Sequence, residues 1–417
     1  MKNFFNKHTF GATIFVFLFM WLVSLIPIQS DFIDPIGQAI SDFELGDIVF
    51  SILKRDSMGK LDDRIVLINT EYKTRKEVGE MIRVINKCQP KAIGIDHFYR
   101  NFKDEDGDTV LSNAFKEVKN LVLVTKVEKY NEYKNVWDTL ETSNVIFMQN
   151  AQTGFANLIS DGDAKHKTCR SFTPVEHMAT GEKEFALSVK LANFYNPKTT
   201  DEFLKRRKTE EFINFKRTIS NGNFAAPNGY FIFRKFDLEG EIYPELFKDK
   251  IVLLGFMGSD NNPKDIDDMF FTPMNPQFAG KSFVDMYGVV IHANIISMIL
   301  DKDYINVVPR WVTNIVAIII CFLNAALFSK IMKNMENWYD ALTKLLQLIQ
   351  TLIVVGLVVY LLYKFNLKID LTLTTVAIVL VGDLLEIYYA VIVNIFQHRK
   401  LIINKINPFK NKFNSIK

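Results

Sequence analysis

Polar and glycine residues that could form a binding site follow two apolar segments in the middle of the chain. The segments are 91–96 ("KAIGID") and 249–258 ("DKIVLLGFMG"). The candidate residues are Asp96, Gly255, Gly258, Asp260, Asp268, Thr272, His292 and Asn294. If both segments are parallel strands, several of these groups lie beyond the carboxyl ends of a sheet, where open α/β sheets bind ligands. The glycines would let a ligand approach the backbone closely.

Each candidate also has a purely structural interpretation. Asp96 can cap the following turn, a glycine after a strand is common in turns, and Asp268 with Thr272 can hold a loop. His292 and Asn294 fall near the start of the apolar helix predicted over 288–300. Free N–H groups there favour anions, but a histidine in an apolar helix is often simply a core residue. The sequence leaves both interpretations open.

The sequence contains none of the common catalytic or metal-binding motifs. It lacks the EF-hand, zinc-finger and zincin spacings, GxGxxG, the Walker loop and GxSxG. Asp96 and the acidic residues of 265–268 could supply carboxylates to a metal, but their spacing favours no particular ion. We therefore expect no enzymatic activity, no cofactor and no metal.

A second polar set lies within apolar segments near the C-terminus and consists of Asn324, Gln347, Gln350, Asp383 and Glu386. Asp383 and Glu386 are three residues apart, so they share one helix face. Carboxylates in lipid are costly, which makes them a functional hypothesis. At about 1.5 Å per residue, Asn324, Gln350 and Asp383 reach a similar depth, roughly 18–20 Å. We expect a polar cluster without a basic partner, which either holds the helices together or binds a partner.

The apolar residues are concentrated in four segments of the 417-residue chain. The whole chain is 48% hydrophobic and 23% charged, which excludes disorder as its main state. The segments 10–28, 311–329, 345–363 and 371–396 are each about long enough to cross a bilayer. The first could instead be a cleaved signal peptide, but no small-x-small site follows it.

Basic residues near the predicted spans set their orientation. Lys2 and Lys7, then Lys330, Lys333 and Lys344, and finally the basic tail 397–417, fall on one side of the membrane. By the positive-inside rule, residues 1–9 and 397–417 are cytoplasmic and residues 31–309 form an extracytoplasmic or periplasmic domain in the inner membrane. Positive charge beside the membrane, rather than on the large domain, argues against nucleic-acid binding.

Strands and helices are predicted to alternate in the region 31–309. Apolar runs predict strands over 64–70, 91–96, 120–127 and 249–258, with a further extended run over 229–236. Helical spacing predicts helices over 74–88, 108–118, 182–195 and 288–300, and the charged segment 198–212 is either an exposed helix or a loop. This order, with strands that are apolar throughout, predicts an α/β domain with a mostly parallel sheet and helices on both faces.

Several of these segments resemble the second type of CHASE domain, the extracellular sensing domain found beside cyclases and histidine kinases. They include "IVLINT", "AIGIDHFYR", "LSNAFKEVKNLVLVTK", "KIVLLGFMGSDNNPKDIDDMFFTP" and "GVVIHANIISMIL", and the resemblance extends over 42–300. One span before the domain and three after it are also typical of the family. Two places differ: Asn69-Thr70 replaces the usual acidic residue after the first strand, with Glu71 nearest, and the "DG-x-x-R" turn is stretched from Asp161-Gly162 to Arg170.

The resemblance implies a membrane sensor or receptor-like protein that detects a small molecule or an envelope protein. Only 21 residues follow Phe396, so we expect the change to be relayed to a separate signalling or envelope protein. A homodimer is expected by analogy alone. The alternative is a structural or scaffolding subunit of an envelope complex that does not sense. Whether Cys88 and Cys169 pair is open.

Overall fold

The computed structural model describes residues 7–25, 44–54, 61–159, 168–219, 229–240, 242–259, 266, 268–275 and 283–395. The chain divides into two compact units. One comprises 35–305, and the other comprises 1–34 with 306–417. Among the candidate residues, Asp260 lies outside the described part of the chain.

A seven-stranded sheet forms the centre of the unit 35–305. Its strands run in the order β10-β1-β11-β2-β3-β4, and β5 also pairs with β3. They are β1 (Ile65–Asn69), β2 (Ala92–Asp96), β3 (Leu121–Asn131), β4 (Val136–Glu141), β5 (Ala151–Phe155), β10 (Phe231–Phe233) and β11 (Ile251–Gly255). Every pairing except β3–β4 is parallel, which confirms the predicted α/β domain with a mostly parallel sheet. Both β1 and β11 are buried along their whole length, which explains why their sequences do not alternate in polarity.

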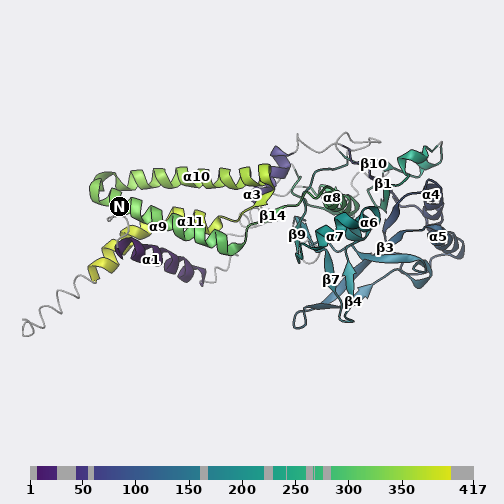
Figure 1. Ribbon diagram of the computed structural model, residues 1–417, viewed down its shortest axis with the longest axis horizontal. Coiled ribbons are helices and arrows are strands. Elements are labelled where there is room, and N and C mark those ends of the chain that lie inside the picture. Colours follow the sequence, from purple (N-terminus) through teal and green to yellow (C-terminus); the bar gives the residue numbers. More distant parts are fainter. Residues whose placement is uncertain are drawn as a thin grey trace, which may run out of the picture. The chain divides into compact units, whose positions relative to one another are not determined.

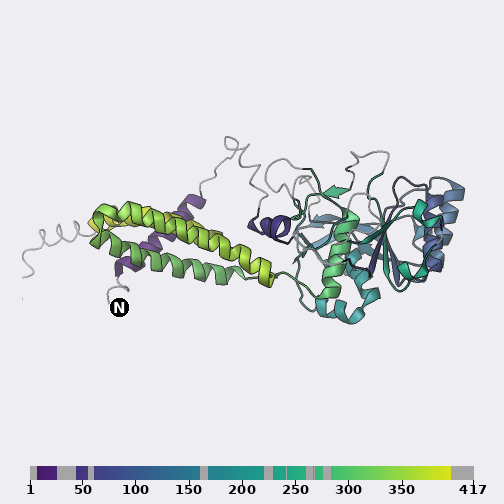
Figure 2. The ribbon, with the colours of Figure 1, turned by 90° about the horizontal axis from the view of Figure 1, so that it is seen from above.

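Helices cover both faces of this sheet (Figures 1 and 2). Helices α4 (Arg75–Lys87) and α5 (Glu105–Glu117) pack against one face, while α6 (Leu187–Tyr195) and α8 (Gly288–Asp301) pack against the other. A capping box fixes the start of α4, because Thr74 and Glu77 each bond the other's backbone N–H. The apolar face of α4, including Val78 and Ile82, packs into one core cluster with the sheet.

The segment 182–195 differs from its prediction as one helix. Residues Lys183–Phe185 form strand β8, which pairs with β7 (Val175–His177), and helix α6 begins only at Leu187. The buried Glu184 accepts a hydrogen bond from Thr125 at 3.0 Å, so tertiary contacts override the helical spacing here. The following charged segment contains helix α7 (Pro197–Leu204) and strand β9 (Glu211–Phe212), which pairs with β6 (Ser171–Phe172). Strands β12 (Met269–Phe270) and β13 (Met286–Tyr287) pair just before α8.

Within its described residues, the second unit contains four helices that are long and apolar enough to cross a membrane. They are α1 (Lys7–Ser24), α9 (Arg310–Asn334), α10 (Tyr339–Phe365) and α11 (Thr372–Ile387), which continues as a π-helix over Tyr388–Val393. Helices α1, α9 and α11 share an apolar core that includes Val16, Cys321 and Val381. A short parallel pairing of β14 (Asn306–Val307) with β15 (Leu367–Lys368) joins the starts of α9 and α11.

Candidate functional site

The carboxyl ends of three neighbouring strands lie side by side. In the sheet register, Gly255 at the end of β11 is paired with Asn69 of β1 on one side and Asp96 of β2 on the other. The sequence could place Asp96 and Gly255 at strand ends, but it could not show that the strands are neighbours. The structure brings these two predicted residues to one edge of the sheet.

The two predicted glycines serve close packing at this edge. A Cβ atom on Gly255 would lie 2.8 Å from the Cβ of Val289, so the glycine lets α8 approach the end of β11. Gly258 has a φ of +79°, and a Cβ there would lie 2.4 Å from the Tyr287 hydroxyl oxygen. Both glycines are therefore explained by the fold itself.

Three further candidates hold parts of the chain together. Thr272 donates hydrogen bonds to Asp285 from its backbone N–H at 2.7 Å and from its hydroxyl at 2.5 Å. The carbonyl of Asp268 accepts the backbone N–H of Gly288, the first residue of α8. Asn294 accepts the backbone N–H groups of Lys216 and Arg217, both at 3.1 Å, and returns a bond to the Arg217 carbonyl. These contacts match the structural interpretation of all three.

Asp96 and His292 differ from the other candidates, because their polar atoms are not used by the described part of the chain. His292 is 3% exposed, and its Nδ1 has no hydrogen-bond partner among the described residues. Burial lowers the pKa of its imidazole, and the charge of Asp96 opposes that shift. The half-buried Asp96 carboxylate itself accepts no hydrogen bond and forms no ion pair within the described ranges. Hydrogen bonds of the described residues therefore do not account for these two groups.

A cavity of about 90 Å³ lies where β1 and β2 end. We refer to it as the edge cavity, and its lining consists of Thr70, Glu71, Lys73, Arg75, Val78, His97, Phe98, Tyr99 and Lys103. Thr70 directly follows β1, and His97 directly follows Asp96 at the end of β2. Its position is the one expected for a ligand in a parallel α/β sheet.

The charged groups of the edge cavity are only partly paired. Arg75 forms a buried ion pair with Asp108, and Lys73 pairs with Glu71 at 2.9 Å. The backbone N–H of Lys103 also bonds to Asp108, at 2.8 Å. In contrast, no ion pair or hydrogen bond of the Lys103 ammonium group occurs among the described residues.

The basic residues of this cavity were not among the candidates predicted from the sequence. The signal was present, because Lys73 and Arg75 flank Thr74, the first residue of the Thr74-x-x-Glu77 capping box. A helix that starts directly after a strand places its first residues at the carboxyl edge. Glu71, the acidic residue nearest the end of the first strand, does lie in the cavity, and its φ of +44° is unusual for a residue with a side chain.

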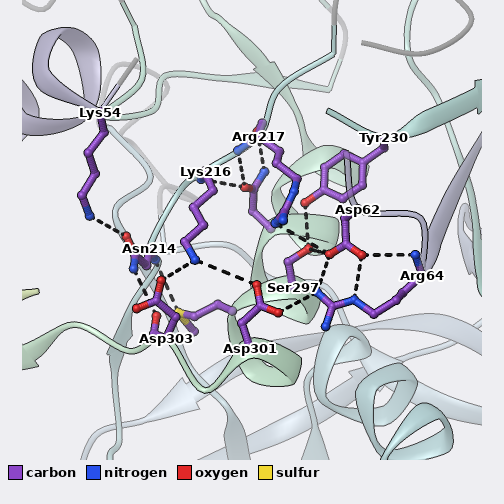
Figure 3. Close-up of polar contacts among 12 residues, drawn as sticks. Lys54, Asp62, Arg64, Asn214, Lys216, Arg217, Tyr230, Ser297, Asp301 and Asp303 are labelled. Atoms are coloured by element: carbon purple, nitrogen blue, oxygen red, sulfur yellow. Dashed lines mark hydrogen bonds and ion pairs between the residues drawn. The ribbon is translucent and has the colours of Figure 1, made fainter. Parts of the chain in front are cut away.

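The opposite, amino edge of the sheet carries a buried polar network around Asp62 (Figure 3). Arg64 donates two hydrogen bonds to the Asp62 carboxylate, both at 2.7 Å, and Ser297 of α8 donates a third at 2.7 Å. Burial alone would raise the pKa of Asp62, but the bonds and charge of Arg64, with Ser297 and Arg217, lower it. Arg64 also bonds Asp301 at the end of α8, at 2.8 Å.

The same network connects the two segments that lead to the apolar helices in the sequence. Lys54, from the segment 44–54 after α1, donates to the Asn214 side chain at 3.0 Å. Asn214 donates in turn to the carbonyl of Asp303, which follows α8 and precedes α9 (Figure 3). Burial lowers the pKa of Lys54 to about 8, while the charge of Asp303 opposes the shift. Arg170, which ends the stretched family turn, forms a bidentate ion pair with Asp47 of this first segment, at 2.7 and 3.0 Å.

The polar set in the apolar helices is brought together in part. Asn324 of α9 and Gln350 of α10 exchange hydrogen bonds at 2.8 and 2.9 Å, and Gln347 donates to two carbonyls of α11. Asp383 and Glu386 are exposed, and no hydrogen bond joins them to Asn324, Gln347 or Gln350 among the described residues. The expectation that no basic group reaches them is wrong for Asp383, which pairs with Lys344. The flexible lysine stem on the first turns of α10 extends along the helix to reach it.

Together, these features define an α/β domain with a small cavity at the carboxyl edge of its sheet, in a chain whose described residues include four long apolar helices. The model of the CHASE2 domain family matches residues 70–328, which is more than half of the chain. The chain therefore belongs to the CHASE2 domain family, as the sequence resemblance indicated. No curated protein and no solved structure matches it.

Proposed function

We propose that this protein is a membrane sensor without enzymatic activity, whose α/β domain binds a small molecule in the edge cavity and relays the event to a separate protein. The cavity at the carboxyl ends of β1 and β2 carries this proposal. The Asp96 carboxylate at the end of β2 lies at the same edge of the sheet, and no described residue donates a hydrogen bond to it. CHASE2 domains are of an extracellular, sensing type, which agrees with this function.

The proposed orientation places the α/β domain outside the cytoplasm. Lys330, Lys333 and Lys344 lie around the connection between α9 and α10, and this connection would then face the cytoplasm. Lys2, Lys7 and the basic tail 397–417 fall on the same side as these three lysines, whereas the other side carries only Arg310, Lys364 and Lys368 close to the ends of the apolar segments. This asymmetry supports an extracytoplasmic domain with both termini inside.

Helix α8 offers a direct route for the relay. It begins beside Gly255 at the carboxyl edge and carries His292 in its second turn. Its other end carries Ser297 and Asp301 into the network around Asp62, about 20 Å away along a 14-residue helix. A ligand that favours one position of α8 would thereby bias the segment that leads to α9.

The proposal can be tested with the full chain in lipid nanodiscs. A library of small metabolites is screened for compounds that raise the unfolding midpoint, and hits are then followed by hydrogen exchange. We expect a hit to protect the edge cavity and also to change exchange over 44–54 and 298–303. The variant His97→Ala, which removes an exposed side chain from the cavity lining, should weaken binding, whereas Ser297→Ala should retain binding and reduce the distant change in exchange.

The same experiment can select the alternative, a scaffolding subunit that senses nothing. One observation favours it, because Gly255, Gly258, Thr272 and Asn294 are all explained by the fold. A complete absence of hits, together with a stoichiometric membrane partner, would contradict sensing and support a scaffold.

A further inference from the structure

We infer that the edge cavity recognises a small oxyanion, a carboxylate or phosphate group, through the ammonium group of Lys103 with Lys73 and Arg75 beside it. This inference rests on the proposed sensing function and adds the chemical class of its ligand. Three cations and one acid, Glu71, line the cavity.

The existing ion pairs leave Lys103 as the group that an incoming anion can use. The Arg75 side chain is 8% exposed and is already committed to Asp108, and rings of Tyr99 and Phe147 lie within 5.6 Å of its guanidinium. Lys73 is held by Glu71 at 2.9 Å. An anion that contacts Lys103 therefore gains a charge-assisted hydrogen bond without breaking either pair.

His97 also lies in the lining of the cavity. Loss of water lowers the pKa of its imidazole, and the positive charges of Lys103 and Arg75 lower it further. Asp96 opposes the shift but does not reverse it. The neutral imidazole can donate one hydrogen bond to a ligand in the cavity.

Helix α4 adds to the same preference. Its 13 residues begin at Arg75, so the positive end of the helix lies at the cavity. The volume of about 90 Å³ limits the ligand, because drug-sized molecules occupy pockets of at least roughly 300 Å³. A single carboxylate or phosphate group fits this size, and a nucleotide does not.

The test is a titration of the full chain in detergent with inorganic phosphate and, separately, with acetate, at constant ionic strength. We expect one of the two probes to bind the wild type, and the comparison identifies which oxyanion is preferred. Lys103→Gln should weaken binding by about fivefold, since one exposed ionic contact is worth about 1 kcal/mol. Glu71→Gln should strengthen it by a similar factor, because it removes the one acid among the described residues of the lining.

Lys91→Gln is the matched control. Lys91 is exposed and directly precedes β2, at the amino end of the strand whose carboxyl end reaches the cavity. Lys91→Gln removes the same positive charge as Lys103→Gln, but at the other end of the strand. Its affinity for the probe should therefore equal that of the wild type. No binding of either probe, or equal weakening by Lys91→Gln and Lys103→Gln, would overturn the inference. A neutral or cationic library hit protecting this cavity would remove the oxyanion class while leaving the sensing function intact.

Discussion

The two edges of the central sheet differ in whether their polar side chains have hydrogen-bond partners. At the amino edge, the Asp62 carboxylate is 1% exposed and accepts bonds from Arg64 and Ser297. At the carboxyl edge, the Asp96 carboxylate and the Nδ1 of His292 have no hydrogen-bond partner within the described ranges, and other residues of the same edge line a cavity. Both edges belong to the same sheet, and the amino edge shows that this chain can supply hydrogen-bond partners to its buried polar groups. The difference agrees with our proposal that the carboxyl edge binds a ligand, while the amino edge stabilises the fold.

The largest expected effect is at the amino edge. Asp62→Ala would leave Arg64 and Arg217 without the carboxylate that they share, and breaking a buried ion pair costs about 3–5 kcal/mol. We expect the free energy of unfolding of the full chain, measured by denaturant in detergent, to fall by that amount. Asp63→Ala is the control, because Asp63 is the exposed neighbour and should change stability by less than about 0.5 kcal/mol. Equal effects of the two variants would contradict a structural role for the network.

This network also shows what the sequence could not reveal. Asp62, Arg217 and Ser297 are far apart in the chain and meet only in the folded domain. The strands themselves were predictable, because β1, β2 and β11 are apolar runs of the right length. Their order was not, since the last of them inserts between the first two, and this insertion places Asn69, Gly255 and Asp96 side by side.

The candidate site was predictable to a similar extent. Asp96 and His292 were identifiable by type and position, whereas the role of Thr272 depends on Asp285, a contact that no local pattern indicates. The basic lining was missed because charges around a helix start usually face solvent, and only the fold shows that Lys73 and Lys103 line one cavity. Local patterns therefore located the edge but not the partners of its residues.

The Asp285 carboxylate lies near the start of α8 and, unlike that of Asp96, accepts hydrogen bonds. Its titration measures what burial of a hydrogen-bonded carboxylate costs. Burial raises its pKa from 3.8 to about 6, and bonds from Thr272 and Asn275 oppose the shift only in part. The folded chain therefore keeps a proton that the unfolded chain has lost between about pH 4 and pH 6. Stability should fall as pH rises through this range, by roughly 2–3 kcal/mol, and stay constant above it.

The measurement is the unfolding midpoint of the wild type and of Asp285→Asn between pH 4 and pH 8. The difference between the two curves isolates this group, because all other titrating residues are shared. The variant should gain stability relative to the wild type as pH rises. A difference that is flat, or that changes in the opposite direction, would show that the Asp285 carboxylate is ionised at no cost.

A smaller effect is expected when the unpartnered imidazole at the carboxyl edge is replaced. A buried polar group without a partner costs about 1–3 kcal/mol, so His292→Leu should stabilise the ligand-free chain by about 1 kcal/mol after the change of shape is included. The exposed His177 provides the control, and His177→Leu should give no such gain. A loss of stability in His292→Leu would mean that the imidazole already has a partner. A gain would be opposite in sign to the effect of Asp62→Ala at the amino edge, where removing a polar group is expected to lower the stability.

The smallest expected effect on stability is the most specific to the comparison. Lys103→Gln should change the free energy of unfolding by less than about 0.5 kcal/mol, because the Lys103 side chain is exposed and its ammonium group has no partner in the described part of the chain. Arg64, the cation at the other edge, is bonded to both Asp62 and Asp301, and Arg64→Gln should be clearly destabilising in the same measurement. If Lys103→Gln were equally destabilising, its charge would belong to the fold, and the two edges would not differ in kind. If Lys103→Gln leaves the free energy of unfolding unchanged, the Lys103 ammonium group contributes nothing to the stability of the fold, and its charge can stabilise a bound anion.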